Sequence, residues 1–201
     1  MSKERLMVTR WSGAAENHQR RYEWAAKYIQ DRSVLDMGCG CGYGTAYLAD
    51  QSPFSNITGV DVDQTALDFA AKYHARPGVE YEKSSLLHSK SSFDVIVCLE
   101  TLEHVEDDLG FLSVLRRKRL NPGGLLLLSV PNEQYAPCNI FDYPFHIRHY
   151  TPAGLQGILS DAGFDVYKWY GQFGSEPGRC DVIAVDQPNC LSIMAVCRRA
   201  G

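Results

Sequence analysis

The chain has 201 residues, of which 45% are hydrophobic and 22% are charged, so we expect one domain, residues 1–201, with a substantial core. A formal net charge of −4 argues against a nucleic-acid partner, because a broad basic surface is missing. No apolar run approaches the roughly 20 residues of a membrane span, so a membrane protein is also excluded.

Seven cysteines are scattered along the chain, and we expect them to be free thiols in a reducing cytoplasm. Cys39 and Cys41 are separated by one residue rather than two, which fits neither a zinc knuckle nor a dithiol redox motif. The sequence therefore predicts a cytoplasmic protein, and it leaves the oligomeric state open.

Hydrophobic periodicity predicts alternating helices and strands. The chain begins with an N-terminal helical segment, residues 1–31, that contains an amphipathic helix within Glu16–Gln30. The predicted strands are Val34–Met37, Ile57–Val60, Val79–Glu82, Phe93–Leu99, Leu125–Val130, Phe164–Tyr170 and Leu191–Cys197. Further helices are predicted over Thr45–Asp50, after a cap at Asp63, over Val105–Leu120 and after a cap at Thr151.

Helices that alternate with strands indicate an α/β fold. We predict a seven-stranded, mostly parallel, doubly wound sheet with helices on both faces and the last strand antiparallel. No helical pattern separates the last two strands, so they are expected to pair antiparallel at one edge. Ligands of such sheets bind beyond the carboxyl ends of the strands, so the segments after the strands are the candidates for function.

Four glycines, at positions 38, 40, 42 and 44, follow the first strand and allow a ligand to approach the backbone closely. A phosphate-binding loop of the ATPase type needs a lysine after its last glycine, where this chain has Thr45. A dinucleotide fingerprint that starts at Gly38 needs a glycine where the chain has Tyr43, whose ring would obstruct helix–strand packing. The first interpretation fails, and the second is weakened.

The segment Val34–Gly42 resembles the first motif of the class I S-adenosylmethionine-dependent methyltransferases. Residues 59–63 resemble the second motif of that family, residues 93–97 its fourth, and residues 120–124 the turn before its fifth strand. Four motifs in the right order are far more specific than one glycine loop. The resemblance implies S-adenosylmethionine as the cofactor and S-adenosylhomocysteine as the product.

The resemblance also implies which residues bind the cofactor. Asp36, at the end of the first strand, suits its ammonium group, and Asp61, at the end of the second, can accept hydrogen bonds from both ribose hydroxyls. The remaining predicted cofactor contacts are Tyr22, Gly38, Gly40, Gly42, Val62, Ser85 and Leu99. The alternatives are a helix cap for either aspartate and simple core packing for Tyr22.

Glu100, Glu103 and His104 follow the fourth strand, and a helix that began there would place them on one face. We predict that His104, oriented by an acid such as Glu100, is the catalytic base; the alternative is that His104 fills the helix start. Two acids and a histidine could also hold a divalent cation, with His146 or His149 as conceivable further ligands. Because no second ligand pair at a fixed spacing is visible, a metal is not favoured.

Two long segments, residues 132–150 and 171–189, are predicted to roof the acceptor pocket. The candidate acceptor contacts in the first are Tyr143, His146 and His149; the alternative is that its aromatic residues pack against the body. We predict methyl transfer to a small-molecule acceptor, with oxygen slightly favoured. The alternatives are an RNA or protein methyltransferase and a catalytically silent cofactor-binding subunit.

Overall fold

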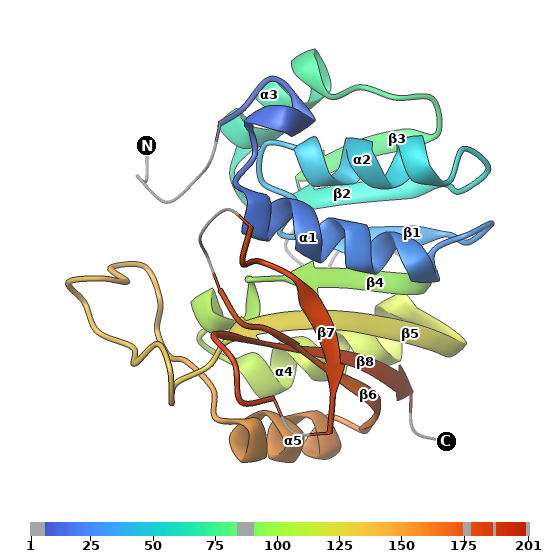
Figure 1. Cartoon of the computed structure of the whole chain (residues 1–201). Helices are drawn as coiled ribbons and strands as arrows, with labels where there is room; N and C mark the ends of the chain where they lie inside the picture. Colours follow the sequence, from blue (N-terminus) through green and yellow to red (C-terminus); the bar gives the residue numbers. More distant parts are fainter. Residues whose placement is uncertain (1–6, 84–90, 175–177, 187, 200–201) are drawn as a thin grey trace.

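The computed structural model describes residues 7–83, 91–174, 178–186 and 188–199. Within these ranges the strands form an eight-stranded sheet in the order β3-β2-β1-β4-β5-β8-β6-β7 (Figure 1). The strands are β1 (Val34–Met37), β2 (Ile57–Asp61), β3 (Val79–Lys83), β4 (Phe93–Leu99), β5 (Leu120–Pro131), β6 (Phe164–Gln172), β7 (Val182–Val185) and β8 (Ser192–Arg199).

The predicted α/β class is confirmed. The arrangement of the last three strands of the chain differs from the prediction in two ways. β1 to β5 pair in parallel, whereas β8 pairs antiparallel with both β5 and β6 and therefore lies inside the sheet rather than at its edge. The edge is formed by β7, which pairs antiparallel with β6. β7 belongs to the segment 171–189 that the sequence assigned to a loop, because its four residues are too few for a clear periodic pattern.

Each face of the sheet is covered by helices. The helices are α1 (Glu16–Ala25), α2 (Tyr43–Gln51), α3 (Gln64–Tyr73), α4 (Asp108–Val114) and α5 (Pro152–Asp161), with short helical turns at Trp11–Gly13, Ala26–Tyr28, Leu102–His104 and Leu115–Arg119. Side chains of α1 and α2 share one core cluster, and those of α4 and α5 share the other. Figure 1 shows α1 and α2 on one side of the strands and α4 behind them.

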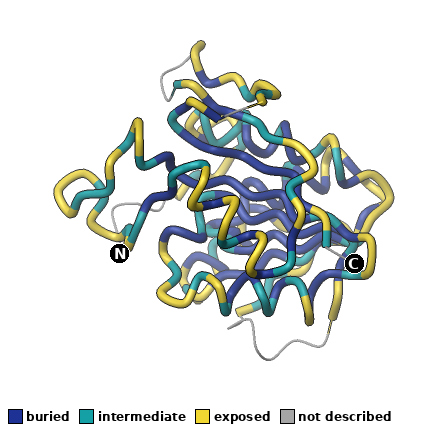
Figure 2. Tube along the Cα trace, turned by 90° about the horizontal axis from the view of Figure 1, so that it is seen from below, coloured by how far each residue is buried: buried dark blue, intermediate teal, exposed yellow. Residues whose placement is uncertain are grey.

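The continuous apolar sequence of β4 follows from this double cover. Val95 and Val97 pack into the cluster of α1 and α2, and Ile96 packs into the cluster of α4 and α5. All three have 0% exposed surface, as expected for a parallel strand that is buried on both faces. Figure 2 shows the same arrangement, with buried residues along the strands and exposed residues at the periphery.

The helix predicted over Val105–Leu120 is shorter and starts later than expected. Leu102–His104 form a single helical turn, and α4 begins only after Asp107, whose carboxylate accepts a hydrogen bond from the Gly110 amide at 2.9 Å. Glu100 has a left-handed backbone with φ of 48°, which turns the chain before that helical turn. Glu100 therefore does not share a helical face with Glu103 and His104.

In the part of the chain that the structure describes, none of the helices combines the length and hydropathy that a bilayer-spanning helix requires.

Candidate active site

A cavity of about 1010 Å³ lies beyond the carboxyl ends of β1, β2 and β4. Its walls come from α1, the glycine loop after β1, the residues after β2, the segment from β4 to α4, and residues 145–146. This is the edge of the sheet at which parallel α/β folds bind their ligands.

Three glycines shape the wall after β1. Gly38, Gly40 and Gly42 have φ values of 78°, 55° and 84°, in the left-handed region that favours glycine. A Cβ atom at Gly38 would lie 2.4 Å from the Thr101 hydroxyl oxygen, and one at Gly42 would lie 2.6 Å from the Cβ of Ala70. A Cβ at Gly40 would meet nothing within 4 Å, so the backbone there faces open space that a ligand can occupy.

Asp36 lies behind this wall, outside the set of described residues that line the cavity. Its carboxylate accepts hydrogen bonds from the Thr45 hydroxyl at 2.6 Å and from the Tyr22 hydroxyl at 3.3 Å. Burial raises the pKa of Asp36 to about 7, although these hydrogen bonds oppose the shift. Tyr22, in contrast, lines the cavity while its ring packs in the core.

Asp61 lies in the cavity wall and has 7% exposed surface. One carboxylate oxygen accepts a hydrogen bond from the Gly40 amide and the other from the Asp63 amide, both at 2.9 Å. The cap of α3 is supplied by Asp63 instead, which accepts from the Thr65 amide at 2.8 Å. Asp61 therefore braces the glycine loop and still faces the ligand space.

Three further predicted cofactor contacts differ in their placement. Val62 lines the cavity with 69% of its surface exposed, so a ligand can pack against its side chain. Leu99 also lines the cavity, but it is buried. Ser85 lies outside the described residues.

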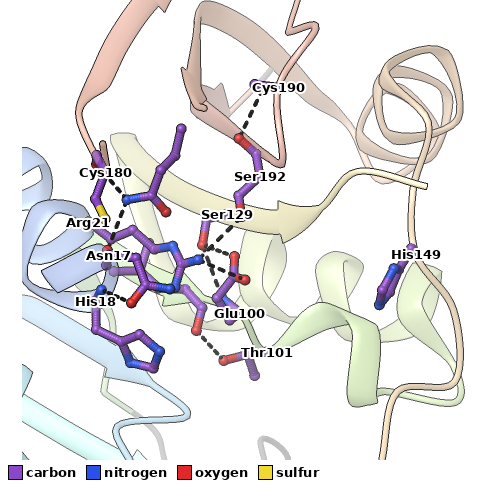
Figure 3. Close-up of polar contacts among 12 residues, drawn as sticks. Asn17, His18, Arg21, Glu100, Thr101, Ser129, His149, Cys180, Cys190 and Ser192 are labelled. Carbon is purple, nitrogen blue, oxygen red and sulfur yellow. Dashed lines mark hydrogen bonds and ion pairs between the residues drawn. The ribbon is translucent and has the colours of Figure 1, made fainter. Parts of the chain in front are cut away.

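Arg21 of α1 also lines the cavity, although it was not among the predicted cofactor contacts. It has 5% exposed surface, and its Nη2 atom lies 3.2 Å from a carboxylate oxygen of Glu100 and 3.2 Å from the hydroxyl of Ser192 (Figure 3). Its Nε atom has no hydrogen-bond partner among the described residues. The signal available in the sequence was its position one turn from His18 and next to Tyr22, two other residues that line the cavity.

Glu100 is therefore a partner of Arg21 rather than of His104. Its second carboxylate oxygen accepts a hydrogen bond from the Ser129 hydroxyl at 2.7 Å. The predicted role of Glu100 in orienting His104 is wrong in this geometry, because the left-handed turn at Glu100 directs the side chain towards α1 and β5 (Figure 3).

His18, beside Arg21, is a neutral group of the cavity wall. Burial is the main cause that lowers its pKa to about 4, and the positive charge of Arg21 acts in the same direction. Its Nδ1 atom lies 2.6 Å from the hydroxyl of Tyr43.

Glu103, His104 and His146 come together on the acceptor side of the cavity. Each offers one possible metal-ligand atom, and these atoms lie within 4.8 Å of one another. Glu103 has 0% exposed surface, whereas His104 is exposed and His146 is half-buried. The cluster combines residues 42 positions apart, which no local spacing in the sequence could reveal.

Hydrogen bonds orient the imidazoles of this cluster. Nδ1 of His104 lies 3.0 Å from the carbonyl oxygen of Phe145, which can only accept, so Nδ1 carries the proton and Nε2 of the neutral ring is an acceptor. Nδ1 of His146 lies 2.6 Å from Nε2 of His149, whose own Nδ1 contacts the Ala136 carbonyl.

The three predicted acceptor contacts are thus in different positions. His146 lines the cavity, whereas Tyr143 and His149 lie behind it, outside the described lining residues. The ring of Tyr143 stacks on His146 at a centroid distance of 5.1 Å. Figure 3 shows His149 well apart from the network of Arg21 and Glu100.

A mostly parallel sheet with a glycine loop after its first strand and an acid after its second is the arrangement of a Rossmann-like, class I S-adenosylmethionine-dependent methyltransferase. Residues 12–168 match the family model described as "Methyltransferase domain", so the chain belongs to that family. Family membership implies S-adenosylmethionine as the cofactor.

Relatives and solved structures agree with this assignment. A protein of Mycolicibacterium smegmatis named "Probable S-adenosylmethionine-dependent methyltransferase" is 34% identical over 78% of this chain and 61% of its own length. The ubiquinone biosynthesis O-methyltransferase of Rickettsia bellii is 35% identical over 71% of this chain and 65% of its own length. The chain thus spans less than two thirds of these relatives.

The fold has a solved counterpart in an S-adenosylmethionine-dependent methyltransferase from Mesorhizobium loti. The TM-score is 0.71 and the identity 19%, with coverage of 94% of this chain and 100% of that one. At this identity the likeness concerns the fold alone.

Proposed function

We propose that this protein transfers the methyl group of S-adenosylmethionine to a small-molecule acceptor and that the acceptor atom is an oxygen. The observation that carries the proposal is that two groups of residues face each other's space in a single cavity. One wall is the glycine loop with Asp61, and the other contains His104 and His146. The names of the O-methylating relatives support oxygen as the acceptor atom.

In the proposed complex, the cofactor lies along the first wall. Asp61 accepts hydrogen bonds from the ribose hydroxyls, and Val62 and Leu99 contact the adenine. The backbone of Gly38, Gly40 and Gly42 passes close to the methionyl part. The ammonium group is balanced by the carboxylate of Asp36, with Tyr22 between them, because Tyr22 donates to Asp36 and lines the cavity.

Arg21 is the group we assign to the carboxylate of the cofactor. It is buried and cationic, and its Nε–H has no acceptor among the described residues, so a carboxylate would satisfy it. Glu100 and Ser192 hold the guanidinium from its other side at 3.2 Å. Glu100 is then a positioning residue for Arg21.

The reaction is an in-line displacement. The acceptor oxygen forms a bond to the methyl carbon, the carbon–sulfur bond breaks, and its electron pair remains on the neutral sulfur of S-adenosylhomocysteine. The acceptor proton passes to Nε2 of His104. His146, whose ring lies 4.7 Å from that of His104, orients the acceptor, with Tyr143 and His149 behind it.

The same three side chains, Glu103, His104 and His146, also suit a divalent cation, since a carboxylate and two imidazoles are common metal ligands. A bound cation would lower the pKa of an acceptor hydroxyl by acting as a Lewis acid. A chelator distinguishes the two routes, because only the metal route loses turnover in its presence.

The test combines binding with turnover. Purified protein should bind S-adenosylhomocysteine in the micromolar range and should not bind NADH; the opposite preference would contradict the proposal. With a methyl-labelled cofactor and a cell extract, the label should appear in small organic molecules. Label in RNA or protein would favour a macromolecular acceptor, and cofactor binding without any transfer would favour a silent subunit.

A further inference from the structure

The segment 7–14 precedes α1 and packs against α2 and α3. The indole of Trp11 stacks on the ring of Tyr47 of α2, with ring centroids 4.0 Å apart and an interplanar angle of 10°. The carbonyl oxygen of Val8 accepts a hydrogen bond at 2.7 Å from Nε2 of His74, directly after α3. Figure 1 shows this segment in dark blue beside the two helices. The segment is therefore attached to both helices that follow the first two strands.

Trp11 also contacts two aromatic rings of the cavity wall. Its ring centroid lies 6.4 Å from that of Tyr22, edge to face, and 6.2 Å from that of Tyr43. Aromatic pairs at such distances are favourable and prefer defined orientations, so the indole restricts how these rings can tilt. Both tyrosines line the cavity, whereas Trp11 lies outside the described lining residues. Trp11 can therefore affect a ligand only through the rings in front of it.

The fourth glycine after β1 lies against the Tyr22 ring. A Cβ atom at Gly44 would lie 2.0 Å from Cζ of Tyr22, the ring carbon that carries the hydroxyl, and 2.2 Å and 2.4 Å from the two adjacent ring carbons. Unlike Gly38, Gly40 and Gly42, this glycine has no positive φ. Its role is thus the close approach of the ring to the backbone of α2, which any side chain at this position would prevent.

The hydroxyl of Tyr22 is the group that these contacts position. It donates to the carboxylate of Asp36 and lies 3.3 Å from each of the two oxygens. One of these oxygens also accepts a hydrogen bond from the Thr45 hydroxyl at 2.6 Å. Asp36 lies behind the cavity wall, so Tyr22 connects its carboxylate to the cavity. Because 3.3 Å is already long for a hydrogen bond between two oxygens, a small displacement of the ring would break the contact.

We propose that Trp11 and Gly44 are positioning residues for the amino-acid end of the cofactor and that they act through the hydroxyl of Tyr22. The indole and the glycine backbone fix the phenol ring, so its hydroxyl stays between the Asp36 carboxylate and the cofactor ammonium. This inference rests on the proposed function, in which the ammonium lies on the cavity side of Tyr22. The segment 7–14 is then part of the cofactor site, although none of its residues lines the cavity.

The test compares the binding of two ligands to the purified full chain. S-adenosylhomocysteine carries the ammonium group, whereas 5′-methylthioadenosine lacks the amino-acid part. Trp11→Ala should weaken S-adenosylhomocysteine binding about threefold to tenfold, the range expected for one lost hydrogen bond, and should leave 5′-methylthioadenosine binding unchanged. Trp11→Phe keeps an aromatic ring at this position and should restore most of the lost affinity.

Further variants show whether the effect passes through Tyr22. Tyr22→Phe should cause the same loss, and Trp11→Ala added to Tyr22→Phe should cause no further loss, because the hydroxyl is already absent. Gly44→Ala forces the phenol ring away from α2 and should show the same difference between the two ligands. The matched control is Tyr73→Ala, which removes a ring contact of 4.5 Å with Phe69 on α3, outside the cavity lining. It should bind both ligands like the wild type.

Three results would overturn the proposal if the wild type binds S-adenosylhomocysteine. They are an unchanged affinity in Trp11→Ala, equal losses for the two ligands, and additive losses in the double variant. A wild type that binds neither ligand would contradict the proposed function, and this inference with it. The melting temperature shows whether each variant is folded. If Trp11→Ala does not fold, Trp11→Leu makes the same comparison, because it keeps an apolar side chain but has no ring.

Discussion

The cavity has two halves that are built in different ways. The half assigned to the cofactor combines buried groups, with 5% exposed surface at Arg21 and 7% at Asp61, with the exposed Val62 and with backbone that packing holds in place. The half assigned to the acceptor combines the buried Glu103 with the exposed His104 and with His146 of the segment 132–150. A cofactor that never varies suits rigid strand ends, whereas specificity for an acceptor is more easily varied on loops.

The largest expected effect that separates the two halves is at His104. His104→Ala should lower turnover by about 10²- to 10⁴-fold, the usual contribution of a general base, while S-adenosylhomocysteine affinity stays unchanged. Single-turnover kinetics and equilibrium binding measure the two quantities separately. Equal losses in both would show that His104 only supports the helical turn Leu102–His104.

The next effect tests the cofactor half through two neighbouring acids. Asp61→Ala should weaken S-adenosylhomocysteine binding about tenfold or more, since hydrogen bonds to a charged group contribute about 1.5–3 kcal/mol each. Asp63→Ala removes the carboxylate that caps α3 but keeps the backbone amide that donates to Asp61, so binding should change much less. Isothermal titration measures the S-adenosylhomocysteine affinity of both variants. Similar losses of affinity would show that Asp61 supports the glycine loop rather than binding the ribose.

Arg21 allows a sharper division within the cofactor half. Arg21→Met should weaken S-adenosylhomocysteine binding roughly tenfold, because a charge-assisted hydrogen bond to the carboxylate is lost. Binding of 5′-methylthioadenosine, which lacks the amino-acid part, should be unaffected. If both ligands lose affinity to the same extent, Arg21 supports the fold of α1 rather than the carboxylate.

The smallest effect concerns pH. An unfolded aspartate ionises near pH 3.9, but folded Asp36 keeps its proton up to about pH 7. Between these values the folded state binds more protons, so the Asp36 contribution lowers the free energy of unfolding as the pH rises through that window. Binding of the cofactor ammonium favours the ionised carboxylate, so S-adenosylhomocysteine affinity should rise with pH across 7.

Urea unfolding and titration of the wild type and Asp36→Asn check this prediction, and both pH trends should flatten in the variant. The comparison is needed because His18, with its pKa lowered to about 4, has the opposite effect between about pH 4 and 6.5. There the unfolded chain binds the additional proton, so the His18 contribution to stability rises with pH. If Asp36→Asn kept the pH dependence of stability and affinity that the wild type has, a group other than Asp36 would be the one that titrates.

The sequence by itself determined the α/β class, the glycine loop and the acids at the carboxyl ends of β1 and β2. These features depend on local interactions: apolar runs of strand length, backbone angles that favour glycine, and carboxylates at the carboxyl ends of strands. Three of the four short motifs lie within or directly after β1, β2 and β4, which pair side by side, so their order along the chain already places them at one edge of the sheet.

Only the tertiary structure decided the acceptor half and the partners of Arg21. Glu100 follows β4 and was expected beside His104, but its left-handed backbone turns it towards Arg21, 79 positions earlier in the chain. His104 meets His146 because the segment 132–150 returns to the turn Leu102–His104, where the Ile147 amide donates to the Glu103 carbonyl, and β7 forms only because β6 offers it an edge. Each of these contacts joins segments far apart in sequence, and their geometry depends on packing of the whole sheet rather than on any local pattern.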